Sequence, residues 1–143
     1  MFLDVGANSG LHAIQLSRYF REVHAFEPYP PMYERLCHSI RINELSNVVA
    51  HQVALSDEAG EAAFRPPGFG NTGTGSLVAD SAGCVDGGLI RVRAAKGDAY
   101  LERTDGVIAA IKIDVEGAEP RVIDGLRERI NRDRPLLVFE VLR

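Results

Sequence analysis

The stretch MFLDVGANSG at residues 1–10, with LHAIQLSRYF at residues 11–20 after it, decides the fold. A short apolar run ends at Gly6, and apolar side chains then recur at helical spacing, at Ala13, Leu16 and Phe20. This order predicts a strand, a glycine turn and a helix. Such a unit opens a doubly wound α/β sheet when the rest of the chain repeats the alternation.

The rest of the chain does repeat it. Residues 23–27 predict a second strand, ended by prolines, and the helix that follows has an apolar face made by Met32, Leu36 and Ile40. Further strands are expected over residues 47–55, 107–115 and 136–142. A helix that opens at Pro120 has Val122, Ile123, Leu126 and Ile130 on its inner face. Residues 61–65 and 89–93 predict a short antiparallel pair. The expected fold is a single α/β domain over residues 1–143 with a mostly parallel, Rossmann-like sheet.

Composition sets the class of protein. The chain has 143 residues, 45% apolar and 25% charged, which suits one globular domain with its own core. A net charge of -4 argues against a nucleic-acid or anionic-membrane partner. Cys37 and Cys84 form neither a zinc motif nor a disulfide framework. With no signal peptide and no long apolar run, we expect a soluble, cytoplasmic protein whose oligomeric state the sequence leaves open.

The glycine turn and an acidic residue together predict a nucleoside site. Gly6 and Gly10 let the backbone turn sharply and approach a ligand, and Asn8 tolerates a left-handed conformation. Glu27 follows Gly10 by seventeen residues, at the tip of the second strand, where a carboxylate can accept both hydroxyls of a ribose. A purely structural turn is the other interpretation. The dinucleotide fingerprint lacks its middle glycine, because Asn8 stands there, which disfavours NAD.

Three more carboxylates, those of Asp114, Glu116 and Glu119, surround a later strand-to-helix turn at the same edge of the expected sheet. Asp114 and Glu116 suit three roles: holding a substrate hydroxyl, acting as general base, or binding a divalent ion. Contact with cofactor or substrate is favoured over a metal site, and no metal is predicted. Glu119 is interpreted as an electrostatic complement to the helix N-terminus.

Four motifs in the same order resemble FkbM-type S-adenosylmethionine-dependent methyltransferases. They are DVGANSG at 4–10, AFEP at 25–28, ALSD at 54–57 and IKIDVEGAE at 111–119, with FEV at 139–141 after them. The resemblance spans nearly the whole chain. It implies the class I methyltransferase version of the doubly wound sheet. It also implies O-methylation of a hydroxyl on a small molecule, a sugar or a secondary metabolite.

The resemblance also implies site residues. The methionine end of S-adenosylmethionine would lie against the first loop, Glu27 would take the ribose hydroxyls, and Ser56 or Asp57 would meet the adenine. From the residues alone, Asp57 is equally a cap or turn residue. Asp114 or Glu116 would orient or deprotonate the acceptor hydroxyl. The loop over residues 68–76 either closes over substrate or is a glycine-rich linker. The full cofactor-binding set is Asp4, Gly6, Ala7, Asn8, Gly10, Glu27, Pro28, Ser56 and Asp57.

Two departures from the family pattern keep other functions open. Family members usually have chain before the first strand and a further strand pair after the fifth, so we expect a sheet without the last pair, from a trimmed core or a short product. Residues 94–98 look irregular where the family more often has a threonine-leucine-aspartate run. A non-catalytic S-adenosylmethionine-binding module that recruits a partner is one alternative. A nicotinamide-dependent oxidoreductase is another, disfavoured by Asn8 and by the lack of a Tyr-x-x-x-Lys run.

Overall fold

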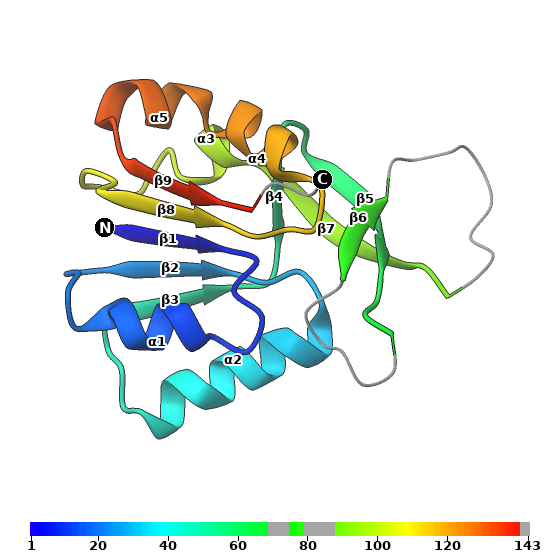
Figure 1. Cartoon of the computed structure of the whole chain (residues 1–143), viewed down its shortest axis with the longest axis horizontal. Helices are drawn as coiled ribbons and strands as arrows, with labels where there is room; N and C mark the ends of the chain where they lie inside the picture. The colour runs from blue at the N-terminus through cyan, green and yellow to red at the C-terminus, as the bar shows by residue number, and fades with distance from the viewer. Residues whose placement is uncertain (69–74, 79–87, 141–143) are drawn as a thin grey trace.

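A computed structural model describes residues 1–68, 75–78 and 88–140. Its main sheet contains five parallel strands in the order β3-β2-β1-β8-β9 (Figure 1). The strands are β1 (Phe2–Val5), β2 (Val23–Phe26), β3 (Val48–His51), β8 (Ala110–Ile113) and β9 (Leu136–Phe139). The strand order reverses next to β1, and ligands of such sheets bind beyond the carboxyl ends of the strands at this point. The predicted mostly parallel α/β fold is confirmed.

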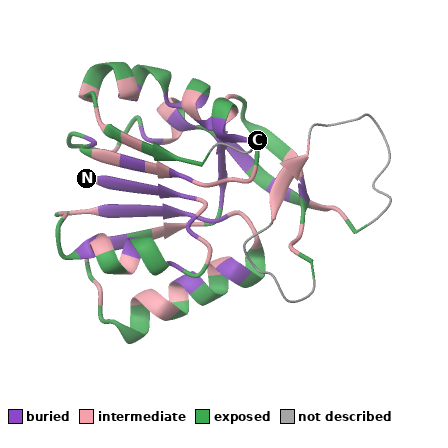
Figure 2. Cartoon of the chain, in the orientation of Figure 1, coloured by how far each residue is buried: buried purple, intermediate pink, exposed green. Residues whose placement is uncertain are grey.

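Helices cover both faces of this sheet (Figure 1). On one face, α1 (Leu11–Ser17) and α2 (Pro30–Ile42) pack against a cluster that contains Phe2, Val23 and Ala25. On the other face lie α3 (Gly97–Tyr100), α4 (Glu119–Gly125) and α5 (Arg127–Asp133), over a cluster that contains Leu3 and Val5. Successive residues of β1 therefore contribute to both cores, as the two-residue period of a strand requires. β1 is buried throughout, whereas the edge strand β9 exposes Leu136, Val138 and Phe139 (Figure 2).

Two expected elements are divided in the structure. The expected strand over residues 47–55 is wrong as a single element: it forms β3 and β4 (Ala54–Ser56), which belong to different sheets. The expected helix from Pro120 also breaks, because Leu126 ends α4 and precedes α5. A Cβ on Gly125 would lie 1.9 Å from the Ser56 carbonyl oxygen, so α4 rests directly on the backbone of β4 there. α4 still buries Val122, and Ile130 of α5, which is partly buried, packs against the same cluster.

The second sheet has the order β4-β7-β5-β6. β5 (Gly60–Arg65) pairs antiparallel with both β7 (Ile90–Lys96) and β6 (Ser76–Val78), and β4 runs parallel to β7. The predicted antiparallel pair is confirmed. Residues 94–98, expected to be irregular, instead end β7 and begin α3.

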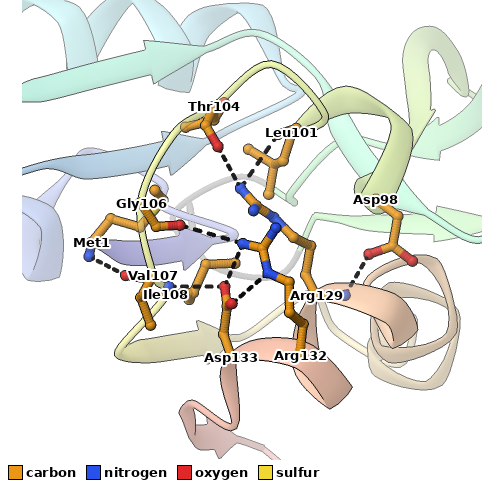
Figure 3. A network of polar contacts seen from close by, with 10 residues as sticks. All are labelled: Met1, Asp98, Leu101, Thr104, Gly106, Val107, Ile108, Arg129, Arg132 and Asp133. Atoms are coloured by element: carbon orange, nitrogen blue, oxygen red, sulfur yellow. Dashed lines mark hydrogen bonds and ion pairs between the residues drawn. The ribbon is translucent and has the colours of Figure 1, made fainter.

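A polar network closes the amino edge of the main sheet (Figure 3). Asp133 accepts hydrogen bonds from the Ile108 N–H at 3.0 Å and from Arg132 Nε at 2.6 Å. The guanidinium groups of Arg129 and Arg132 donate to three backbone carbonyls of the segment before β8, those of Leu101, Thr104 and Gly106. The network fixes this segment onto α5 and leaves the opposite, carboxyl edge as the place for a ligand.

Some predictions fall on residues 69–74, 79–87 and 141–143, outside the described part of the chain. They concern most of the loop expected over residues 68–76, Cys84, and the end of the strand expected over residues 136–142. These stay predictions. No helix in the described ranges is both long enough and apolar enough to cross a membrane.

Candidate functional site

The first loop, residues 6–10, takes the conformation that its glycines predict. Gly6 has a φ of 77° and Asn8 a φ of 51°, both left-handed. The N–H groups of Gly6 and Ala7 donate to the Phe26 carbonyl at 3.0 and 2.9 Å, which ties the loop to the tip of β2. A Cβ on Gly6 would lie 1.9 Å from the Asp114 carbonyl oxygen, so only glycine fits between the tips of β1 and β8.

Glu27 is held by the backbone at the tip of β2. Its two carboxylate oxygens each accept one N–H, from Asn8 and from Tyr29, both at 2.9 Å. The side chain is buried, and burial raises the pKa of its carboxyl above the ordinary value despite these two hydrogen bonds. Each carboxylate oxygen keeps acceptor capacity, since a carboxylate offers about four lone-pair sites. The arrangement presents a fixed, bidentate acceptor.

A cavity opens beside Glu27 between the two sheets. Apolar side chains of β2, α2 and the second sheet form most of its walls, and Tyr29 and Phe64 stack with ring centroids 5.7 Å apart. It is also lined by Gly6 and Asn8 of the first loop and by Asp114, which follows β8. A mostly apolar pocket with a few convergent polar groups is the usual form of a small-molecule site. The flat apolar end suits a base, and the carboxylate beside it suits a ribose.

Lys112 connects the first loop to both neighbouring acids. Its ammonium Nζ lies 3.2 Å from Asp4 Oδ1 and 3.4 Å from Asp114 Oδ2, and donates to the Gly6 carbonyl at 3.3 Å. Asp4 also accepts the Ala13 N–H of α1 at 3.0 Å. Burial raises the pKa of the Asp4 carboxyl, although Lys112 acts to lower it.

The predicted carboxylate turn follows β8. Glu119 accepts hydrogen bonds from the N–H groups of Val115 and Gly117, so it fixes the turn that precedes its own helix. Asp114, Glu116 and Glu140 place carboxylate oxygens within 4.8 Å of one another. Burial, with the negative charges of Asp114, Glu140 and Glu119, raises the pKa of the Glu116 carboxyl. Glu116 is thus made more basic.

Ser56 and Asp57 lie at the tip of β4 in the second sheet. Ser56 Oγ donates to Asp57 Oδ1 at 2.9 Å, and Arg121 Nε donates to the same oxygen at 2.8 Å. Burial acts to raise the pKa of the Asp57 carboxyl, but the hydrogen bonds from Arg121 and Ser56 outweigh it and the pKa lies below its usual value. This cluster links β4 to α4.

The structure thus divides the predicted residues into two groups. Five line the cavity: Gly6, Asn8, Glu27, Pro28 and Asp114. The others are not among the residues that line it: Asp4, Ala7, Gly10, Ser56, Asp57 and Glu116. No role was predicted from the sequence for Lys112, Tyr29 or Phe64. Lys112 has a usable signal, because residues two apart on a strand share a face and Asp114 follows it by two. Phe64 comes from the second sheet, where no motif marks it.

Comparison with known proteins identifies the family of the chain. A crystal structure of Methyltransferase FkbM from Methylobacillus flagellatus KT superposes with a TM-score of 0.67 at 19% identity, covering 96% of this chain and 32% of that one. Methyltransferase sdnD of Sordaria araneosa is 31% identical over 157 residues, covering 88% of this chain. The chain spans 60% of that relative's length. The methyltransferase FkbM domain matches residues 4–143. The predicted resemblance is confirmed: the chain belongs to the FkbM methyltransferase domain family.

Proposed function

We propose that the chain binds S-adenosylmethionine and directs its methyl group to a hydroxyl oxygen of a small molecule, a sugar or a secondary metabolite. The observation that carries this proposal is the buried Glu27 carboxylate, fixed by the Asn8 and Tyr29 amides at the mouth of an apolar cavity. That geometry suits the two hydroxyls of a ribose, with a base against Tyr29 and Phe64. Family membership supports the transfer of a methyl group.

The residues present fit this cofactor. Glu27 would hold the ribose, and the end of the cavity at Gly6, Asn8 and Asp114 would receive the amino-acid part. Bound S-adenosylmethionine supplies a methyl group on a positively charged sulfur, and the carbon–sulfur bond breaks with its electron pair left on sulfur as the acceptor oxygen takes the methyl group. The chain's own part is to orient the acceptor, exclude water and take the hydroxyl proton.

Two carboxylates are candidates for taking that proton. Asp114 faces the cavity but shares the Lys112 ammonium, which favours an orienting role. Glu116 has a raised pKa and is the better proton acceptor of the two. We assign orientation of the acceptor hydroxyl to Asp114 and its deprotonation to Glu116. In this assignment the proton moves to a Glu116 oxygen as the new oxygen–carbon bond forms.

Calorimetric titration with S-adenosylmethionine tests the proposal, beside Glu27→Ala, with Glu58→Ala as an exposed-carboxylate control and NAD as a control ligand. We expect micromolar binding of S-adenosylmethionine, lost in Glu27→Ala and kept in Glu58→Ala. Absence of binding by folded wild-type protein, or equal binding of NAD, would refute it.

The catalytic assignment has its own test. Release of the demethylated product is followed with a panel of sugar and metabolite hydroxyls. Glu116→Gln is expected to slow it by about 100-fold or more, and Asp114→Asn by less. Full turnover by both variants would remove them from the mechanism. Binding without turnover on any acceptor would favour the non-catalytic binding module instead.

A further inference from the structure

Lys112 is one cation shared by two carboxylates in unequal surroundings. Asp4 is fully buried, the Lys112 side chain is 14% exposed and the Asp114 side chain is 42% exposed. The ammonium lies slightly nearer to the buried acid, at 3.2 Å against 3.4 Å. Of the three groups, only Asp114 lines the cavity beside Glu27.

The fold fixes this sharing. Asp4 on β1 stands directly opposite Lys112 on β8 in the parallel register. Asp4 cannot turn away, because its other oxygen accepts the Ala13 N–H of α1. The Gly6 carbonyl, 3.3 Å from Nζ, holds the ammonium on the same side. Asp4 and Gly6 together therefore prevent the ammonium from pairing with Asp114 alone.

The charges of this cluster do not cancel. Two carboxylates share one ammonium, and Glu116 and Glu140 place further carboxylate oxygens within 4.8 Å of those of Asp114, so negative charge remains. Of the two acids that share Lys112, the one that lines the cavity is Asp114. With the base and ribose at Tyr29, Phe64 and Glu27, the sulfur end of the ligand faces Gly6 and Asp114. The methyl donor carries one more positive charge there than its demethylated product, which is a neutral thioether. A residual negative charge attracts the first more than the second.

We propose that Asp4 and Lys112 are positioning residues that set the preference for the methyl donor over its demethylated product. Asp4 retains the ammonium, so that Asp114 keeps a net negative charge toward the cavity. This inference rests on the proposed function, and it adds a role for two residues that do not reach the cavity themselves.

Calorimetry tests it with wild-type protein, two single variants and one double variant. Each is titrated with S-adenosylmethionine and with S-adenosylhomocysteine, and the ratio of the two dissociation constants is compared. Asp4→Asn keeps an acceptor for Ala13 but releases Lys112 to Asp114, so the preference for the methyl donor falls by about three- to tenfold. Asp114→Asn lowers it by a similar factor. Asp4→Asn with Lys112→Met removes both buried charges and returns the preference to at least the wild-type value.

A merely structural role gives a different pattern. Loss of loop shape weakens both ligands together and leaves their ratio unchanged, and the double variant is then no better than Asp4→Asn. Asp133→Asn is the matched control, since it also neutralises a buried, cation-paired carboxylate, at the opposite edge; its ratio stays at the wild-type value.

The results distinguish failure of this inference from failure of the proposed function. If wild-type protein binds both ligands and the ratio moves in neither single variant, or the double variant stays at the level of Asp114→Asn, the inference is wrong and the proposed function stands. If folded wild-type protein binds neither ligand, both fall. Should Asp4→Asn fail to fold, the double variant, which buries no unpaired charge, decides the question with Asp114→Asn.

Discussion

The two edges of the parallel sheet carry the same kinds of group and use them differently. At the amino edge, Arg132 pairs with Asp133 and donates to the carbonyl of Gly106 at 3.3 Å. At the carboxyl edge, Lys112 pairs with Asp4 and donates to the carbonyl of Gly6, also at 3.3 Å. Both glycines have positive φ angles. A cation, a carboxylate with little or no exposure and a glycine carbonyl thus recur at opposite ends of the strands.

The two edges differ in whether the charge of the carboxylate is fully balanced. At the amino edge the Arg132 hydrogen bond lowers the pKa of Asp133, which also accepts the Ile108 N–H, so the carboxylate is fully matched. At the carboxyl edge burial raises the pKa of Asp4, and its cation is divided with a second acid that faces a cavity. A buried polar network in which every group has its partners rigidifies the structure. An unmatched charge at the cavity is what distinguishes the edge at which we propose that a ligand binds.

The largest expected difference between the two edges is in the free energy of unfolding when the glycine at each edge, Gly6 or Gly106, is replaced by alanine. Gly6→Ala places a Cβ 1.9 Å from the Asp114 carbonyl oxygen, so the tips of β1 and β8 must separate. We expect the free energy of unfolding to fall by about 3 kcal/mol or more, with loss of ligand binding. Gly106→Ala meets only the flexible end of Met1 at 3.2 Å and should cost about 1 kcal/mol, from its positive φ. Urea unfolding measures both; equal losses would contradict the contrast.

A row of polar side chains that belongs to neither edge should make the stability of the fold depend on pH. Tyr100 Oη lies 3.2 Å from His51 Nδ1, His51 Nε2 lies 2.9 Å from His24 Nδ1, and His24 Nε2 lies 3.1 Å from Glu22. One choice of tautomers lets Tyr100 donate to His51 and His51 donate to His24 while both rings are neutral. Burial, and then the neighbouring His24, lowers the pKa of His51 from 6.5 to about 4.

The unfolded chain therefore binds a proton at His51 that the folded chain does not, between pH 6.5 and about 4. Stability falls as the pH drops through this window, by about 2 kcal/mol after allowance for solvent screening at a partly exposed ring. Urea unfolding from pH 7 to 4.5 should show this loss in wild-type protein and in a His38→Gln control. A His51→Gln variant that keeps the full pH dependence would exclude the assignment.

The last expected effect concerns the carboxylate of Asp133. Asp133→Asn weakens a closed network, and we expect the free energy of unfolding at pH 7 to fall by about 1–2 kcal/mol. Because the folded pKa is lowered, the carboxylate stabilises the fold above its ordinary value of 3.8 and loses this effect as the pH falls below it. The difference from wild type should therefore shrink toward pH 3. Weakened binding of S-adenosylmethionine would show that the two edges are not independent.

The sequence was informative where structure is local. The alternation of strands and helices, the left-handed Asn8 and the place of Glu27 at the tip of β2 follow from residues close together in the chain. Turn chemistry and strand tips are set by short-range sterics, so a motif of ten residues suffices to predict them. The antiparallel pairing of β5 with β7 was also predictable, from two short strands and a turn.

Long-range register was not predictable. That Asp4 stands opposite Lys112 depends on the alignment of β1 with β8, more than a hundred residues apart. The division of the expected third strand at Gln52 and Val53, and of the last long helix at Leu126, follows from how two sheets and α4 pack together. The apolar periodicity of each segment is the same whether it is divided or continuous.

The division of the expected third strand into β3 and β4 affects which side chains lining the cavity can change independently. Because the chain leaves the parallel sheet after β3, the cavity gains walls of separate origin: Glu27 and the first loop on one side, and Phe64 and Leu77 on the other. The first wall is constrained by steric limits at Gly6. The second belongs to a small mixed sheet, whose side chains can be exchanged without disturbing the five parallel strands. The proposed ribose contact at Glu27 and the outline of the pocket on the side of the second sheet are thereby carried by separate modules, so one can change while the other is preserved.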